Sequence, residues 1–243
     1  MSQELIPADL FTDLPSTEHA DESFDDVATA TDYLQRLQLL SKGKYVDSKQ
    51  AAGGDYAIII DSETCRSLGD TIDVMVFERR HKALDMSDTN AVLVSYDPKS
   101  DLYADIRARS SEKDSGCQYG VEFLVAERST AKLYGFFFGT KSLRRVLQTM
   151  YAYMPLTPQD IERRGLSDVE PHGPLPLTLT SKNVRSRDGK YSWFVPEFHD
   201  CSTPFTKRQL ASPEKIRDEL IKFRTPDVQE SAVVKNERKG RAR

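Results

Sequence analysis

Residues 120–138 read GVEFLVAERSTAKLYGFFF, in which two apolar runs flank the polar segment 128–130. Runs rich in β-branched and aromatic residues predict β-strands, here over 120–127 and 131–138. A gap of three residues between two strands is typical of a β-hairpin. Because strand side chains alternate between two faces, one face of this hairpin must enter a hydrophobic core. The stretch therefore predicts a β-rich domain built around this hairpin.

Further strands are predicted on both sides of this hairpin. Upstream, a short apolar run follows two glycines at 53–54, and a longer segment alternates between apolar and polar residues. Downstream, Asp188-Gly189 lies between two apolar runs, which is a strong hairpin signal. The strands predicted outside 120–138 are 55–60, 72–81, 91–96, 175–184 and 191–198.

Helical periodicity is clearest over 143–154, where apolar residues recur at i, i+3, i+4, i+7 and i+8. A last helix is predicted over 213–223, with a serine as N-cap and a proline at the first helical position. Leucines at a spacing of three predict a short helix over 28–40. The Pro-rich segment 155–176 predicts a loop.

The order of these elements is several strands, one inserted helix, two strands and a terminal helix. This order fits a mainly β fold with some α: a five-stranded Greek-key barrel of the OB type, elaborated by the inserted helix and the C-terminal helix. It also fits an α+β sandwich. Regular βαβ alternation is missing, which argues against a doubly wound sheet or a TIM barrel.

Charge is distributed unevenly along the 243 residues. Residues 1–35 contain nine acidic residues and no lysine or arginine, whereas 235–243 contain five basic residues and one acid. The acidic segment has too few apolar residues to offset the entropy lost on ordering. We therefore expect an acidic disordered arm over 1–35, an OB-like β-barrel domain over 36–205, a C-terminal helix within 206–226 and a basic flexible tail over 227–243.

Composition also indicates the compartment. No run approaches the ~18 consecutive apolar residues that a membrane span needs, and the N-terminal sequence lacks the basic-then-apolar build of a secretion signal. The three cysteines, Cys65, Cys117 and Cys201, form neither a disulfide framework nor a CxxC zinc knuckle. These features predict a cytoplasmic protein, in the host cytoplasm if the chain is viral, with no membrane partner.

Catalytic motifs are missing from the chain: it contains no GxxxxGK[ST], GxGxxG, HExxH or GxSxG. Cys117, His199 and Cys201 are candidate zinc ligands, but His199 and Cys201 alone make half a site. Carboxylate pairs that could hold Mg²⁺ lack a lysine at the spacing found in nucleases. We therefore predict no enzymatic activity, no cofactor and no metal site. These carboxylate pairs are Asp70 with Asp73, Asp85 with Asp88, and Glu122 with Glu127.

Single-stranded nucleic acid is bound by aromatic faces on which bases stack and by cations that follow the backbone. Two segments, 128–145 and 182–193, combine aromatic and basic residues beside a predicted hairpin. The order of the strands would place both segments on one barrel surface, although the same rings also suit a hydrophobic core. The predicted nucleic-acid-binding residues are Arg128, Lys132, Tyr134, Phe136, Lys141, Arg144, Arg145, Lys182, Arg185, Arg187, Lys190, Tyr191 and Trp193.

Several segments between Leu37 and Phe205 carry a family resemblance. They are LQLLSKGK (37–44), GGDYAIII (53–60), LGDTIDVMVFERRHKALD (68–85), DSGCQYGVEFLV (114–125), FFFGTKSLRR (136–145), YSWFVPEF (191–198) and CSTPF (201–205). The stretch resembles single-stranded DNA-binding proteins of OB fold that tailed bacteriophages encode. The resemblance implies that the chain coats single-stranded DNA. It assigns binding roles to Tyr134, Phe136, Lys141, Arg145, Tyr191 and Trp193.

The resemblance has one departure. Bacterial-type members commonly end in an acidic tip that recruits partners, whereas this chain ends in Arg-Ala-Arg. A partner-recruiting role would therefore fall to the acidic N-terminal arm, which would contact replication or recombination proteins. The same arm could also compete with nucleic acid for a cationic groove.

We therefore predict a non-enzymatic, viral single-stranded DNA-binding protein that coats replication or recombination intermediates. One alternative is a viral structural or protein-interaction protein, whose charged arms dock partner chains. A second alternative is a metal-dependent nuclease. The preference for DNA or RNA and the oligomeric state stay open.

Overall fold

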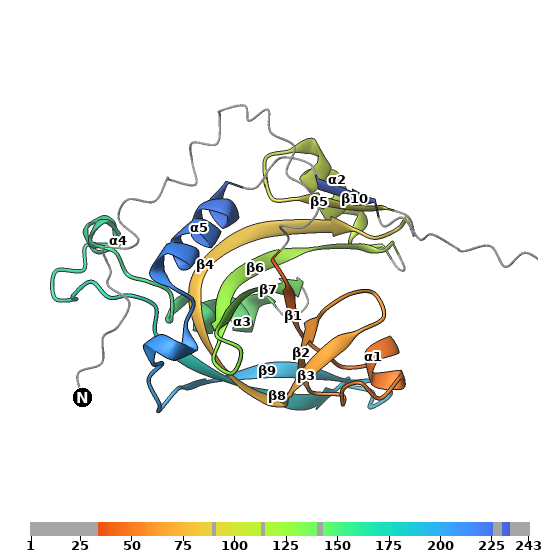
Figure 1. Cartoon of the computed structure of the whole chain (residues 1–243). Coiled ribbons are helices and arrows are strands. Elements are labelled where there is room, and N and C mark those ends of the chain that lie inside the picture. Colours follow the sequence, from red (N-terminus) through yellow and green to blue (C-terminus); the bar gives the residue numbers. More distant parts are fainter. Residues whose placement is uncertain (1–33, 89–90, 113–114, 140–142, 226–229, 234–243) are drawn as a thin grey trace, which may run out of the picture.

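The computed structural model describes residues 34–88, 91–112, 115–139, 143–225 and 230–233. Within these residues the chain is mainly β, with several helices (Figure 1). The strands are β1 (Arg36–Leu39), β2 (Tyr56–Ile59), β3 (Cys65–Gly69), β4 (Thr71–Asp85), β5 (Ala91–Ser95), β6 (Cys117–Glu127), β7 (Lys132–Gly139), β8 (Pro176–Arg185), β9 (Ser192–Asp200) and β10 (Glu230–Val233). The helices are α1 (Lys44–Asp47), α2 (Asp101–Arg109), α3 (Leu143–Tyr151), α4 (Pro158–Arg164), the 3-10 helix η2 (Lys207–Gln209) and α5 (Pro213–Arg224).

All ten described strands belong to one mixed sheet. Its main path is β10-β5-β4-β6-β7-β1-β2-β3, and β8 pairs with both β4 and β9. The pair β1–β7 is parallel, and the other pairs are antiparallel. Among the described strands, β3, β9 and β10 have one neighbour each, so the sheet is not closed. A mainly β fold is therefore confirmed, whereas a closed OB-type barrel is not.

Strand β4 connects the parts of this sheet. It pairs with β8 through its first residues, with β6 through most of its length and with β5 at its end. A register shift between Val76 and Glu78 leaves Phe77 without a partner on β6, which is the geometry of a β-bulge. Before the bulge, Val74 and Val76 enter the main core, whereas Phe77 lies in a second apolar cluster.

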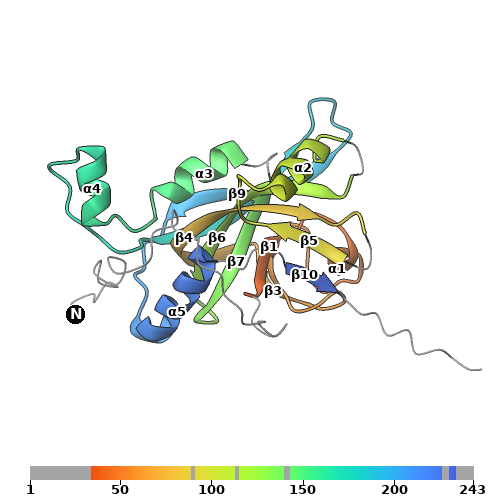
Figure 2. The same ribbon diagram turned by 90° about the horizontal axis from the view of Figure 1, so that it is seen from above.

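Helices cover both sides of the sheet. Residues Val146 and Met150 of α3 fill the main core between the curved strands. On the other side, α5 packs against Met75 and Phe77 of β4. Figure 2 shows α2 and α3 on one side of the sheet and α5 on the other. The two faces of β4 therefore meet different partners.

The sequence of α5 explains where the helix begins and what it buries. The Ser212 side chain accepts a hydrogen bond from the Lys215 N–H, and Pro213 occupies the first helical position. The buried residues of α5 are Ile216, Leu220 and Phe223, at the i, i+4, i+7 spacing of one helical face. The predicted helices over 213–223 and 143–154 are confirmed as α5 and α3.

All strands predicted from alternation are present, with bounds that differ by a few residues. The helix predicted over 28–40 is wrong where the chain is described, because Arg36–Leu39 forms β1 and pairs with β2 and β7. The predicted loop 155–176 contains α4, which a capping box at Thr157 begins and a left-handed Gly165 ends. Elements without any sequence prediction are α1, α2, β3, η2 and β10.

The two charged segments fall mostly outside the described residues. These include 1–33 of the predicted acidic arm and 227–229 and 234–243 of the predicted basic tail. The remaining part of that tail, Glu230–Val233, forms β10 and pairs with β5. No helix in the described part of the chain is both long and apolar enough to cross a membrane.

The central hairpin depends on a close backbone approach at Gly120. This residue pairs with Gly139 on β7. A Cβ atom at Gly120 would lie 1.9 Å from the carbonyl oxygen of Phe138, whereas a Cβ atom at Gly139 would lie 4.0 Å from its nearest neighbour. A side chain would therefore clash at Gly120, whereas Gly139 has room for one.

We expect Gly120→Ala to lower the free energy of unfolding by about 3 kcal/mol, because the new methyl group forces β6 and β7 apart. The matched variant Gly139→Ala should change it by less than about 1 kcal/mol. Urea unfolding followed by circular dichroism measures both values. Equal effects of the two substitutions would contradict the close approach at Gly120.

Candidate nucleic-acid interface

The β8–β9 hairpin presents two aromatic rings to solvent. Tyr191 is 66% exposed and Trp193 is 42% exposed. Trp193 pairs with Val184 near the end of β8, and Tyr191 precedes the first residue of β9. Both rings therefore lie close to the tip of the hairpin, outside the hydrophobic core.

Hydrogen bonds within the turn define the position of Tyr191. The Ser186 N–H donates to the Tyr191 carbonyl oxygen at 2.8 Å, and the Tyr191 N–H donates to the Ser186 hydroxyl oxygen at 3.0 Å. The Ser186 hydroxyl donates to the Asp188 carboxylate at 2.5 Å. This bond, together with that from the Lys190 N–H, lowers the pKa of Asp188. Gly189 adopts the left-handed conformation that this turn requires, with φ of 71°.

The opposite face of β9 attaches the hairpin to the rest of the fold. Phe194 follows Trp193 and therefore points to the other face of the strand. Its ring lies so close to Gly54 that a Cβ atom there would be 2.7 Å from a ring carbon. The Phe194 N–H also donates to the Ser41 hydroxyl at 3.0 Å. Trp193 is thus displayed on a strand whose other face is packed.

Basic residues surround the two exposed rings. Arg185, Arg187 and Lys190 are exposed, and among the described residues none of them pairs with a carboxylate. Lys182 is also exposed, but it forms an ion pair of 2.5 Å with Glu197 on the neighbouring strand. The hairpin tip therefore combines aromatic faces with positive charge.

The predicted stacking role of Tyr134 and Phe136 is wrong, because both side chains are only 1% exposed. They lie in the main core, where the Phe136 ring contacts Tyr56 edge to face at 6.0 Å. The Tyr134 hydroxyl donates to Thr130 at 3.0 Å. The prediction that side chains of β7 alternate between two faces is correct. The face that carries Tyr134 and Phe136 points into the core, however, where a base cannot reach it.

The predicted nucleic-acid-binding role of Arg128 is also wrong, because its guanidinium stabilises the fold instead of facing solvent. It lies 3.1 Å from the Asp73 carboxylate and 4.4 Å from the centre of the Phe205 ring. It also donates hydrogen bonds to the Cys201 sulfur at 3.1 Å and to the Thr203 carbonyl oxygen. This network ties the β6–β7 turn to the segment after β9.

Arg128 and Lys132, two members of the first predicted cluster, do not lie beside the exposed rings of the β8–β9 hairpin. Lys132 is exposed at the first position of β7, next to the turn that Arg128 anchors. That turn lies beside the C-terminal end of β9, whereas the exposed rings lie at its N-terminal end. The length of β9 separates these ends by about 26 Å, at ~3.3 Å per residue. Lys141 lies outside the described residues, and Arg144 and Arg145 lie in the first turn of α3.

The candidate zinc ligands are not brought together. Cys117 is the first residue of β6, whereas Cys201 contacts Arg128, which follows the last residue of the same strand. About ten residues of extended chain, roughly 33 Å, separate these positions. His199 instead bonds the Thr180 hydroxyl at 3.1 Å. Among the described residues no group of His, Cys, Asp and Glu side chains has the arrangement of a metal site.

The carboxylates considered for a nuclease have structural partners. Asp73 binds Arg128, and Asp85 binds Arg109 at 2.7 Å. Glu127 accepts hydrogen bonds from the N–H groups of Ser129 and Thr130 in the hairpin turn. Hydrogen bonds from Ser87 and Arg109 lower the pKa of Asp85 to about 2. These groups therefore stabilise turns and strand ends.

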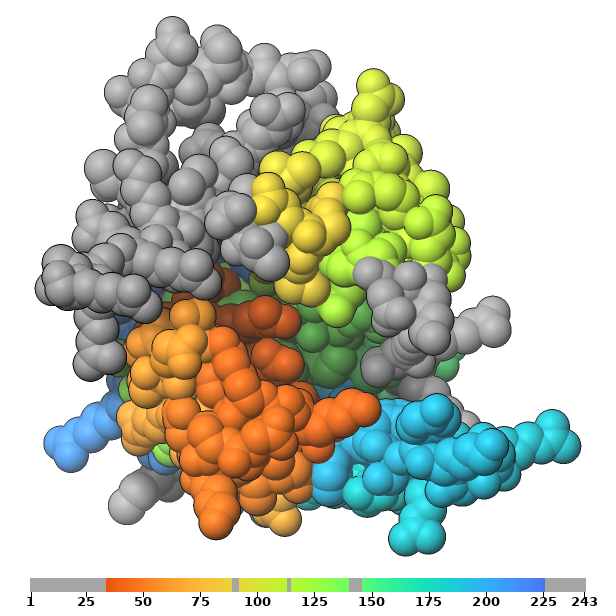
Figure 3. Space-filling view, turned by 90° about the vertical axis from the view of Figure 1, so that its right-hand side faces the viewer, coloured from red at the N-terminus to blue at the C-terminus, as the bar shows by residue number. Residues whose placement is uncertain are grey.

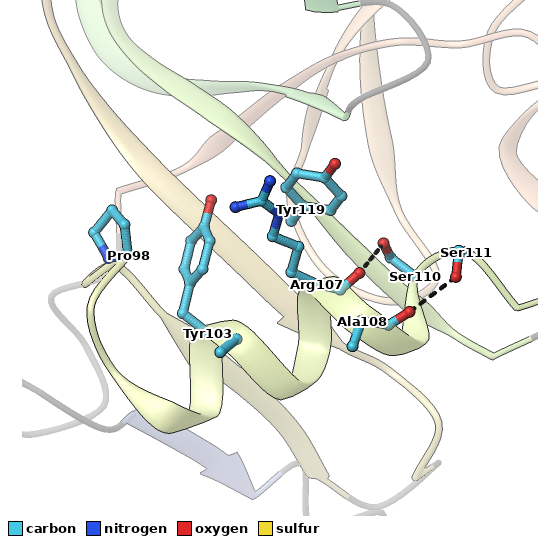
Figure 4. A pocket seen from close by; sticks show the side chains of 8 residues that line it. Pro98, Tyr103, Arg107, Ala108, Ser110, Ser111 and Tyr119 are labelled. Carbon is cyan, nitrogen blue, oxygen red and sulfur yellow. Dashed lines mark hydrogen bonds between the residues drawn. The ribbon is translucent and has the colours of Figure 1, made fainter.

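A pocket beside α2 was not found from the sequence. It has a volume of about 490 Å³, and its lining includes Tyr103, Arg107 and Tyr119. Figure 4 shows the Arg107 guanidinium between the two tyrosine rings. Ser100, the N-cap before Asp101, is a sequence signal that would have predicted α2. Tyr103 and Arg107 then lie one helical turn apart. The pocket also needs Tyr119 from β6, a contact that sequence spacing does not reveal.

The space-filling view shows a hollow between several elements (Figure 3). Segments of α2 and β5 lie above it, β1–β3 lie to its left, and the β8–β9 hairpin lies further below on the same face. The exposed hairpin and the helix that carries Arg107 are thus both visible on this face of the molecule.

Comparison of the chain with protein-family models, curated proteins and solved structures finds no significant match.

A separate charge cluster lies on the α5 side of the sheet. Glu122 is buried and pairs with Arg80 at 2.8 Å and with Lys82. Burial alone would raise the pKa of Glu122, but the positive charges of Lys82 and Arg80 lower it overall. The Arg80 guanidinium also lies 3.7 Å from the centre of the Tyr96 ring and 4.2 Å from that of Phe223. These cations therefore stabilise the sheet.

We expect Glu122→Gln to lower the free energy of unfolding by about 3–5 kcal/mol at pH 7, because it leaves two half-buried cations without a counter-charge. The pKa of Glu122 in the folded protein lies below its ordinary value of 4.5. Its stabilisation is therefore present above pH 4.5 and is lost as the pH falls through the folded pKa. Urea unfolding from pH 7 downward should show the gap between wild type and variant narrowing below pH 4.5. A gap that is constant with pH, or an equal effect of the exposed control Glu112→Gln, would contradict this assignment.

We expect Arg128→Ala to lower the free energy of unfolding by about 2–3 kcal/mol, because it leaves Asp73 without its cation and removes the contact with Phe205. Lys132→Ala, at an exposed position nearby, should change it by less than about 0.5 kcal/mol. Thermal and urea unfolding measure both. If the two variants were equally stable, Arg128 would not have the structural role described.

Proposed function

We propose that this chain is a non-enzymatic protein that binds single-stranded DNA, with the tip of the β8–β9 hairpin as its principal contact. One observation carries the proposal: Tyr191 and Trp193 are exposed beside the basic residues Arg185, Arg187 and Lys190. Aromatic rings provide stacking faces for bases, and the cations attract the phosphate backbone. Stacking of this kind tolerates every base, which suits a protein that coats DNA of any sequence.

The order of the strands supports an OB-type arrangement. If β5, α2 and α4 are treated as insertions, the remaining elements β4, β6, β7, α3, β8 and β9 follow the order strand-strand-strand-helix-strand-strand. The first of these strands, β4, pairs with both the second and the fourth. We infer an elaborated OB-type barrel in which β1–β3 are additional strands. In such folds the loop between the last two strands contacts oligonucleotides, and here that loop is the tip of the β8–β9 hairpin.

The proposal extends to the biological setting that the resemblance implies. The chain would coat replication or recombination intermediates of a tailed bacteriophage in the host cytoplasm. Its acidic N-terminal segment would recruit replication or recombination proteins. A protein-interaction role at the same hairpin is the main competitor, because exposed Trp, Tyr and Arg side chains are also frequent in protein interfaces.

The single tryptophan of the chain is Trp193, so intrinsic fluorescence reports directly on the proposed contact. We expect addition of oligo-dT to quench this fluorescence and to protect Trp193 from acrylamide. The dissociation constant should be micromolar or tighter at low salt and should rise as salt displaces the cation–phosphate contacts. Unchanged fluorescence together with unchanged anisotropy of a labelled oligonucleotide at low salt would overturn the proposal. Capture of a protein partner without DNA binding would then favour the interaction role.

We expect Trp193→Ala to weaken oligo-dT binding by about tenfold or more, because stacking on one ring contributes ~1–3 kcal/mol. The conservative variant Trp193→Phe should keep most of the affinity. The free energy of unfolding should change by less than about 1 kcal/mol, because the ring is exposed. Fluorescence anisotropy with a labelled oligonucleotide measures the affinity, and Val169→Ala, at an equally exposed residue, is the control. A strong loss of stability with unchanged affinity would mean that the ring is structural.

A further inference from the structure

We propose that the pocket beside α2 is a second contact site for the same DNA strand, with Arg107 binding a phosphate and Tyr119 contacting a base. This inference rests on the proposed function. It extends that function from the β8–β9 hairpin to a helix that is remote from it in sequence. No residue of this pocket was predicted from the sequence to bind nucleic acid.

The pocket has the chemistry that a nucleotide requires. Its volume of about 490 Å³ lies in the range of small-molecule sites. The Arg107 guanidinium lies 5.5 Å from the centre of the Tyr119 ring, which is only half-buried. Tyr103 is buried and forms a wall of the pocket (Figure 4). A base could therefore contact the accessible side of Tyr119 while its phosphate meets Arg107.

Local ion pairs leave the charge of Arg107 available. Two acidic residues near α2 form ion pairs with a different arginine. Arg109 binds Asp105 at 2.6 Å and Asp85 at 2.7 Å. Within the part of the chain that the structure describes, Arg107 forms no ion pair with a carboxylate. Its side chain is exposed, so a phosphate can reach it without displacing a protein partner.

Aromatic rings, a histidine and an arginine continue from the pocket along one face of β4. His81 contacts the Tyr103 ring edge to face, with ring centres 6.3 Å apart. Two residues earlier, and therefore on the same face, Arg79 lies 4.1 Å from the centre of the Tyr151 ring of α3. Arg79 and His81 are exposed. Basic and aromatic side chains thus follow one another from α2 to α3 on the side of the sheet opposite α5.

The elements that carry the two sites lie on the same side of the molecule. In Figure 2 the tip of the β8–β9 hairpin and α2 project beyond the same side of the sheet as α3. In Figure 3 both elements are visible on the same face of the molecule. A strand whose bases stack on Trp193 could follow this face and place a later nucleotide at Arg107. A short oligonucleotide would then occupy one site, and a longer one would occupy both.

The test uses Arg107→Ala in the full chain, with a series of oligo-dT lengths. Arg107→Lys should restore binding, because it keeps the charge. Arg217→Ala is the control, since Arg217 is exposed on α5, on the opposite side of the sheet. Alanine favours the helix at both positions, so we expect all three variants to fold. Anisotropy measures affinity, and Trp193 fluorescence reports occupancy of the hairpin independently.

We expect Arg107→Ala to weaken binding of long oligo-dT by about five- to tenfold and to lower the slope of affinity against salt by about one. The shortest oligonucleotides should bind as to wild type, and saturating DNA should still quench Trp193 fully. Equal affinities and salt slopes for Arg107→Ala and Arg217→Ala at every length would overturn the second site alone. Wild-type protein that fails to bind oligo-dT would overturn both proposals, whereas binding that is insensitive to Trp193→Ala but sensitive to Arg107→Ala would overturn only the role of the hairpin.

Discussion

The β-bulge at Phe77 controls which side chains of β4 face which side of the sheet. Before it, the residues with even numbers, such as Val74 and Val76, enter the main core. After it, the residues with odd numbers, such as Arg79 and His81, take that side. Because strand side chains alternate with a period of two, one extra residue reverses the assignment for the rest of the strand. A regular β4 would turn Arg80 away from Glu122 and leave that buried carboxylate without a cation.

The bulge therefore separates cations that stabilise the fold from cations that face solvent. On the α5 side, Arg80 and Lys82 are held by Glu122 and by aromatic rings. On the other side, Arg79 is exposed next to α3, and Arg107 is exposed on α2. A cation removed from water stabilises the fold only when a counter-charge lies against it, whereas an exposed cation keeps its charge available for a ligand. Arg79 and Arg107, on the α2 side, are therefore the cations that a polyanion could contact.

The alternation of apolar and polar residues predicted the strands well. It did not predict which other elements pack against each face of a strand. The aromatic residues of β7 and of the β8–β9 hairpin follow the same pattern in the sequence, yet Phe136 is buried and Trp193 is exposed. The difference comes from residues distant in the chain, since α3 and β2 cover the ring of Phe136. The same limit explains β1, where Leu37 fits a helical spacing of leucines but is buried by pairing with β2 and β7. The pocket beside α2 likewise depends on a tertiary contact between a helix and Tyr119.

The position of the exposed rings follows from how the hairpin is held. Phe194 packs against Gly54 on one face of β9, and this packing presents Trp193 on the other. Backbone and hydroxyl bonds between Ser186 and Tyr191 fix the tip in the same way. Rings that are already ordered lose little conformational entropy when a base stacks on them, so more of the stacking energy appears as affinity. A ring on a loose loop would have to be ordered first. For the proposed function, a packed strand and a hydrogen-bonded tip would make the hairpin a better contact for DNA than the basic and aromatic composition of the segment alone would indicate.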